Sequence, residues 1–205
     1  MRAGGFILIL LALLAVIGPA LYRKSPTAQD RENVYQSPSF SGPLLGTDGM
    51  GRDVLARNLH AARFTLATAL AGVVLAVLLG TAAGAAAGLT GGIMDRLVMR
   101  STELTMALPA LYLILAVRNL FPDSITPFTA GFIIVISLAA VGWSGVARVV
   151  RGRVLSIREE PYVVSARAAG ASRLRLIRVH ILGILRPFVL LQVGLYLPYF
   201  LLGEV

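Results

Sequence analysis

The sequence predicts an all-α, polytopic membrane protein with a bundle of about five transmembrane helices. Of its 205 residues, 57% are hydrophobic and only 14% are charged, whereas a soluble domain carries about 25% charged residues. The mean hydropathy is +0.79. Long apolar runs alternate with short polar or basic segments, and each run predicts one helix: residues 6–22, 64–89, 104–117, 128–147 and 188–205.

The first apolar run follows Arg2 and, with residues 3–5, is just long enough to span a membrane. Residues 1–22 are therefore predicted as the first transmembrane helix. The small residues around Pro19 leave a cleaved signal peptide as the alternative. Residues 23–63 are polar and rich in Pro and Gly, and predict an extracytoplasmic segment. An apolar face in residues 54–62 predicts a short amphipathic helix on the membrane surface.

Residues 64–205 are predicted to form the transmembrane core. Residues 64–89 carry no charge, and small residues recur every fourth position, which predicts a seam where another backbone packs closely, either in this chain or in a partner subunit. We expect the third helix at residues 97–120, kinked at Pro109. The fifth helix reaches Val205 without a polar tail, so we expect the sequence to be incomplete. The seam residues are Gly72, Ala76, Gly80, Gly84 and Gly88.

Residues 148–187 form a basic segment between two apolar runs and hold nine of the eighteen arginines. Basic loops stay cytoplasmic, so this segment and the amino terminus are predicted to lie in the cytoplasm. Glu159 and Glu160 before Pro161 predict a helix start, and a short helix is expected over residues 162–176. Gly170 inside it costs about 1 kcal/mol relative to Ala, which indicates a bend or a close contact. The alternative is a solvated loop on lipid headgroups.

Several function classes are excluded or disfavoured by composition. There is no cysteine, no Gly-rich phosphate loop around the single lysine Lys24, and only two histidines, so we expect no bound cofactor, no metal site and no catalytic residues. The net charge of +9 lies between apolar runs, which favours anionic lipid over nucleic acid as its partner. We therefore do not expect an enzyme.

The basic segment carries a recognisable motif. Tyr162-Val-Val-Ser-Ala-Arg-Ala-Ala-Gly-Ala-Ser172, followed by Arg178-Val-His-Ile-Leu182, resembles the cytoplasmic EAA motif loop of ABC-transporter permeases, closest to the dipeptide/oligopeptide branch. Two further stretches resemble the same branch: Leu45-Gly-Thr-Asp-Gly-Met-Gly-Arg-Asp-Val-Leu-Ala-Arg57 and the turn at residues 91–100. The EAA positions that match are Ala166, Gly170, Ile181 and Leu182, while Val164 replaces Glu, Ser165 replaces Ala and Gly183 replaces Pro.

The resemblance implies a type I ABC permease fold and a permease subunit of a bacterial inner-membrane importer for di- or oligopeptides. Its implied partners are a second permease, usually a different chain, two cytoplasmic ATPases that use ATP and Mg²⁺, and an extracytoplasmic substrate-binding protein. A coupling helix in the cytoplasmic loop would contact the ATPase. The implied coupling residues are Tyr162, Ser165, Ala166, Arg167, Ala169, Gly170, Ala171, Ser172, Arg173 and Ile181.

Other substrates and other classes stay open at this point. Nickel, glutathione and opine permeases share this loop chemistry. An autonomous channel, a secondary transporter or a membrane scaffold are the rivals from another class. Residues 64–89 and 128–147 contain no ionisable side chain, which argues against ion-coupled transport.

Overall fold

The computed structural model describes residues 2–109, 112, 113, 115, 116, 119–121, 126–170 and 182–203. These residues form helices without any sheet; one isolated bridge joins Thr47 and Asp53. The all-α fold class is confirmed. The chain divides into two compact units, Met1–Ala67 and Thr68–Val205. Its helices are α1 (Arg2–Leu21), α2 (Val54–Thr90), α3 (Gly92–Ala107), α5 (Pro127–Ile157), α6 (Pro161–Ala168) and α8 (Leu182–Gly203).

Three helices in the described part are long and apolar enough to cross a membrane: α2, α5 and Gly183–Leu202 of α8. The predicted first helix agrees with α1. The separate surface helix at residues 54–62 is wrong, because α2 continues unbroken from Val54 to Thr90. No glycine or proline interrupts the sequence between Val54 and Gly72, so nothing ends the helical hydrogen bonding there.

The start of α2 is fixed by Asp53, which occupies the N-cap position. Its Oδ1 accepts a hydrogen bond from the Ala56 amide at 3.0 Å, and this contact satisfies one of the free amides of the first turn. Its Oδ2 accepts from the Tyr22 hydroxyl at 2.7 Å and from Lys24 Nζ at 3.1 Å. The carboxylate therefore joins the end of α1, the following loop and the start of α2 within the first unit.

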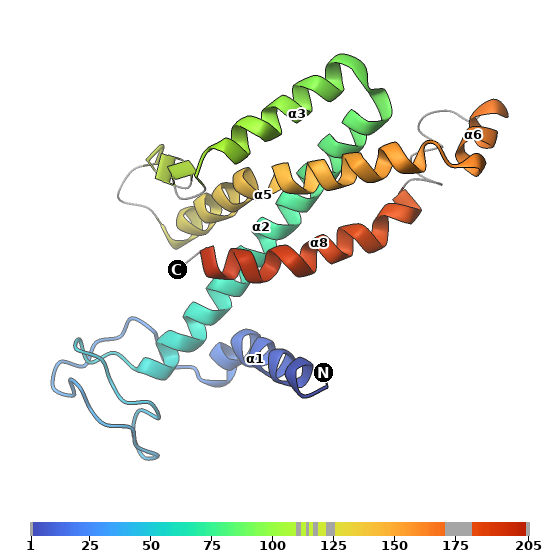
Figure 1. Cartoon of the computed structure of the whole chain (residues 1–205). Helices are drawn as coiled ribbons and strands as arrows, with labels where there is room; N and C mark the ends of the chain where they lie inside the picture. Colours follow the sequence, from blue (N-terminus) through green and yellow to red (C-terminus); the bar gives the residue numbers. More distant parts are fainter. Residues whose placement is uncertain are drawn as a thin grey trace. The chain divides into compact units, whose positions relative to one another are not determined.

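In the second unit, α5 lies between α3 and α8 (Figure 1). The largest fully buried side chain is Phe200 on α8, which packs against glycines of α2 and α5 at Gly72 and Gly142. Close packing of these apolar side chains between the helices favours one arrangement of the helices. The remaining core residues are Ala69, Val73, Ala76, Val77, Leu138, Ala139, Val146, Val150, Val154, Ile157, Val163 and Leu185.

Three predicted boundaries are corrected. The third helix begins at Gly92, and α3 ends at Ala107; Leu108 is extended (φ −83°, ψ 130°) because a residue preceding proline avoids the helical region. Helical residues recur after Pro109 at 112, 113, 115 and 116, so the proline interrupts the predicted helix of residues 97–120 and does not merely kink it. The fourth helix continues ten residues beyond Ala147, to Ile157. The fifth begins at Leu182, and Pro187 lies inside it. Helix therefore occupies both ends of the basic segment at residues 148–187.

Candidate coupling segment and membrane cleft

The predicted small residues of α2 face α5 of the same chain. A Cβ at Gly80 would lie 2.6 Å from the Trp143 carbonyl oxygen, and one at Gly84 would overlap the Ala147 carbonyl. At Gly88 a Cβ would lie 2.8 Å from Val154. Ala76 is fully buried, and a Cβ at Gly72 would lie 3.1 Å from Leu138. The backbones of α2 and α5 approach closely along this line because it lacks larger side chains.

Arginines of the basic segment bind other helices of the second unit. Arg151 forms an ion pair with Asp95 on α3, and the hydrogen bond from Arg151 Nη2 to Asp95 Oδ2 is 2.6 Å. Arg148 Nε donates to Thr102 Oγ1 at 3.1 Å. Arg158 donates to the Gly88 carbonyl at 3.2 Å. The hydrogen bond from Arg151 holds the pKa of the Asp95 carboxylate below its ordinary value, with burial opposing it.

The short helix α6 follows α5 after a turn at residues 158–160. It begins at Pro161, as predicted from the two glutamates and the proline. Val163 is buried and Ala166 is half-buried against the core, so these two side chains face the chain itself. Tyr162, Ser165 and Ala169 lie three to four residues apart and are exposed. This exposed side of α6 and of the residue after its end is the part most open to a partner, and Ala166 is only partly open.

The end of α6 explains the glycine in this helix-prone stretch. The helix ends at Ala168, eight residues before the predicted end, and Gly170 has φ +84°. Left-handed backbone of this kind is adopted readily by glycine, which commonly follows the last residue of a helix. No atom of the described chain lies within 4 Å of a Cβ built there. The side chain of Arg167 and the residues Ala171, Ser172, Arg173 and Ile181 lie outside the described part.

A cleft opens between α3, α5 and α8, with a volume of about 520 Å³. Its lining combines apolar residues with hydroxyl and amide groups, and none of the lining residues is charged. The amide comes from Gln192, which is buried in the middle of α8. The lining residues are Thr105, Met106, Leu108, Pro109, Val141, Gly142, Ser144, Gly145, Gln192, Leu195, Tyr196 and Tyr199.

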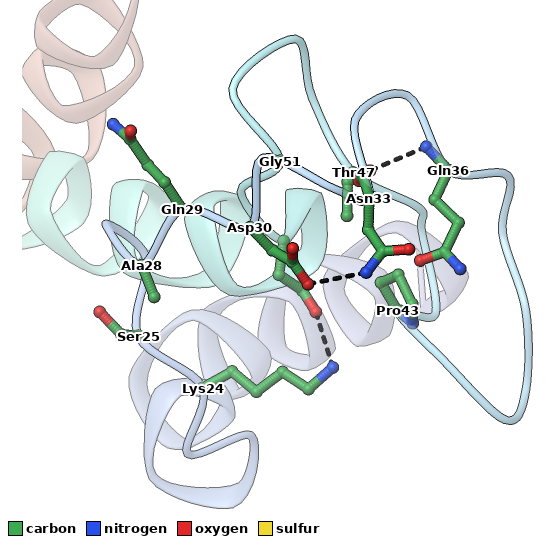
Figure 2. A pocket seen from close by; sticks show the side chains of 11 residues that line it. Lys24, Ser25, Ala28, Gln29, Asp30, Asn33, Gln36, Pro43, Thr47 and Gly51 are labelled. Carbon is green, nitrogen blue, oxygen red and sulfur yellow. Dashed lines mark hydrogen bonds and ion pairs between the residues drawn. The ribbon is translucent and has the colours of Figure 1, made fainter.

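The first unit holds a second, polar cavity of about 280 Å³ in the loop that follows α1. Figure 2 shows the Asn33 amide directed at Asp30, and the Nδ2–Oδ2 distance is 2.8 Å. Lys24 Nζ, which also borders the cavity, donates to Asp53 Oδ2 at 3.1 Å. The hydrogen bond that Lys24 Nζ donates to the Asp53 carboxylate raises the pKa of Lys24. Because each of these charged groups already has a partner in the chain, the cavity is explained by the folding of the loop.

The stretch Leu45–Arg57 that carries the second resemblance is a compact turn. Asp48 Oδ1 accepts from the amides of Met50 and Arg52 at 2.9 and 3.0 Å, and its Oδ2 pairs with the Arg52 and Arg57 side chains. Burial raises the pKa of Asp48, but these hydrogen bonds and charges outweigh it and lower the pKa to about 2. Gly51 has φ +72°, and a Cβ there would overlap the Asp30 carbonyl, so the turn requires glycine.

Comparison with known proteins identifies the family. Residues 76–205, which include the seam except Gly72, α6 and the cleft, match the family model described as binding-protein-dependent transport system inner membrane component. The chain belongs to this family. Family membership therefore places the chain in a membrane transport system and agrees with the three apolar helices of membrane-spanning length.

Curated relatives of this transport family match nearly the whole chain. The dipeptide transport system permease protein DppC of Bacillus subtilis (strain 168) is 33% identical over 98% of the chain and 61% of its own length. The oligopeptide transport system permease protein OppC of the same organism is 29% identical over 95% and 62%. A probable peptide ABC transporter permease, y4tQ of Sinorhizobium fredii (strain NBRC 101917 / NGR234), is 38% identical over 92% and 62%. The chain thus spans about three fifths of these relatives' length.

Two features of this family member escaped the sequence analysis. The pairing of Asp95 with Arg151 joins residues 56 positions apart, and only an acid early in α3 hinted at it. Gln192 is the one amide in the apolar run of residues 188–205, and that isolated polar residue was the available signal.

Proposed function

We propose that this chain is a permease subunit of an ABC importer that carries di- and oligopeptides across the bacterial inner membrane. The observation that supports this most strongly is the similarity, over 98% of the chain, to a permease named for dipeptide transport. The chain works with a second permease subunit, two cytoplasmic ATPases and an extracytoplasmic binding protein. ATP is hydrolysed by the ATPases and not by this chain.

The exposed side of α6 is the proposed contact with the ATPase. Tyr162, Ser165 and Ala169 present one aromatic ring flanked by small groups, a surface that fits into a groove of a partner. Val164, which replaces the family's Glu, is also exposed and contributes no charge to the contact. Because α5 precedes α6 after a three-residue turn and packs on α2 and α3, a displacement of α6 is transmitted to the membrane helices. The free energy that α6 can transmit is limited to the difference in its contacts with the ATPase between two conformational states of the transporter.

The test is peptide uptake by the assembled transporter in proteoliposomes. The chain is co-expressed with the ATPases, the second permease and the binding protein of its transport system. We expect ATP-dependent accumulation of radiolabelled trialanine, and co-purification of the ATPases with the chain. Accumulation of nickel or glutathione without any uptake of peptide would contradict the proposed substrate. Failure of the ATPases to co-purify would contradict the proposal that the chain is an ABC importer subunit.

A further inference from the structure

Gln192 is a buried amide at the midpoint of an apolar membrane helix. It is the eleventh of the 22 residues of α8, and only 8% of its surface is exposed. Among the described residues, no hydrogen bond reaches its side chain. An amide placed in such an environment without a partner destabilises the fold, and polar groups within membrane spans commonly mark a transport pathway.

The Gln192 amide borders the cleft between α3, α5 and α8. Leu195, Tyr196 and Tyr199 follow it on the same side of α8, at the spacing of one helical face. Across the cleft, α5 presents Gly145, where a Cβ would overlap the Tyr196 hydroxyl oxygen. Because Gly145 has no side chain, the Tyr196 hydroxyl can lie against α5 at the edge of the cleft.

The other buried polar residue of the described lining, Ser144, already has a partner. The Ser144 hydroxyl donates to the Val141 carbonyl at 3.2 Å, so its proton is engaged within α5. Gln192 keeps both an N–H donor and a carbonyl acceptor for a ligand. None of the described residues that line the cleft is charged, so none of them supplies a countercharge to an ionised solute. Its volume of about 520 Å³ falls in the range of small-molecule sites.

We propose that Gln192 hydrogen-bonds the main-chain amides of peptides as they pass through this cleft. A carboxamide donates to a peptide carbonyl and accepts from a peptide N–H, so it matches a group that every peptide carries whatever its side chains. The tyrosine rings next to it supply apolar contact for those side chains. This inference rests on the proposed function, and it names the part of the chain that meets the substrate.

The first experiment asks whether peptide enters the cleft. A photoreactive phenylalanine analogue replaces Leu195, which lines the cleft, or Leu190, an exposed residue of α8 that does not. Irradiation follows during ATP-driven uptake of radiolabelled trialanine. We expect labelled peptide on the chain with the probe at position 195 and not at position 190. Attachment of position 195 to a second permease chain in place of the peptide overturns the inference.

The second experiment uses a ratio of uptake rates, which cancels any loss of folded protein. Trialanine is compared with the same tripeptide methylated on its central amide nitrogen. Gln192→Leu should lower the ratio about fivefold, the factor that one neutral hydrogen bond supplies. Ser137→Ala removes another buried polar group, whose hydroxyl donates to the Ile133 carbonyl away from the cleft, and should leave the ratio unchanged.

The outcomes separate this inference from the proposed function. Wild-type transporter that carries trialanine, together with an unchanged ratio in Gln192→Leu, overturns the role of Gln192 alone. Wild-type transporter that carries no peptide overturns the proposed substrate, and the role of Gln192 with it.

Discussion

Arg151 on α5 donates two hydrogen bonds to the carboxylate of Asp95 on α3. Its Nε binds Oδ1, and its Nη2 lies 2.6 Å from Oδ2. Both side chains are mostly buried, with 30% and 19% of their surfaces exposed. Two parallel hydrogen bonds between charged groups fix the orientation as well as the distance of the partners. The pair therefore sets how α3 lies against α5 at the cytoplasmic end proposed for these helices.

We predict that this pair stabilises the second unit. Asp95→Asn and Arg151→Gln should each lower the free energy of unfolding by roughly 1–3 kcal/mol, and the double variant should lose less than their sum because both remove one interaction. Thermal denaturation in detergent measures this. The exposed pair of Arg100 and Glu103 on α3 is the matched control, and Arg100→Gln should cost less than about 0.5 kcal/mol. Additive losses at 95 and 151 would contradict the coupling.

The second prediction concerns the line of small residues on α2. Gly80→Leu or Gly84→Leu should push α2 away from α5 and cost roughly 1–3 kcal/mol, because the new side chain meets backbone that cannot rotate aside. The control is Gly152→Leu on α5, where nothing lies within 4 Å. Melting temperatures in detergent should fall for the two α2 variants only. Equal melting temperatures for all three would show that the contact has room for a side chain.

The third prediction places the ATPase contact at the end of α6. Gly170→Arg puts a large side chain where φ is +84°, which costs roughly 1–2 kcal/mol in the left-handed conformation and disturbs the exposed helix end. ATPase co-purification and peptide uptake should both fall at matched membrane levels. Gly152→Arg adds the same charge to the basic segment at an ordinary helical position and should retain both. If the two variants behave alike, the solvated-loop interpretation of this segment is supported instead.

The fourth prediction is a loss of order at low pH in the turn that precedes α2. The pKa of Asp48 is lowered to about 2, and that of Asp53 is also lowered: burial raises it, but the Ala56 amide, Tyr22 and Lys24 outweigh burial. A lowered folded-state pKa contributes stability above the unfolded value of 3.8, and that stability disappears as the pH falls toward 2. Pepsin cleavage within residues 30–53 should therefore rise steeply below pH 4.

The control for the pH experiment is Asp48→Asn, compared at each pH so that the activity of pepsin cancels. This variant should already be cleaved faster than wild type at pH 4.5. The ratio of the two cleavage rates should fall toward one as the pH approaches 2. A constant ratio across the whole range would contradict the role of the Asp48 carboxylate.

The fifth prediction is the orientation in the membrane, with the amino terminus and the basic segment in the cytoplasm. The chain contains no cysteine, so single reporter cysteines can be introduced at Ser39 and Ser172. An impermeant thiol reagent added to intact cells should label Ser39→Cys and spare Ser172→Cys, and both should react after the cells are opened. Labelling of position 172 alone in intact cells would reverse the topology.

Sequence reasoning succeeded where local rules act. The start of α6 at Pro161 follows from acids and proline at a helix start, and the first helix follows from its unbroken apolar run. It placed other boundaries wrongly because contacts between distant residues decide them. The arginines at 148, 151 and 158 were interpreted as parts of a loop. Arg148 and Arg151 instead lie on α5 and bind Thr102 and Asp95, and Arg158, directly after α5, binds the Gly88 carbonyl.

The sequence motif predicts a helix that begins at α6, but it does not predict which way the side chains of that helix face. The partial burial of Ala166 depends on the core that it packs against, which includes Val163 on α6 and Leu185 on α8. The cleft was invisible in the sequence because residues from three helices form it. Only its amide, Gln192, stands out in the sequence, because a polar side chain is costly within an apolar run.

The length of α5 has a mechanical consequence. A helix of 31 residues measures about 46 Å, and the hydrocarbon core of a membrane is about 30 Å thick, so roughly one third of α5 projects beyond it. The far end of this rigid rod lies about 30 Å from the bilayer midplane if the excess is on the side of Ile157. A rocking motion of about 10° around the midplane then sweeps that end sideways by about 5 Å, so α5 acts as a lever arm that converts a small tilt within the membrane into a large stroke at α6.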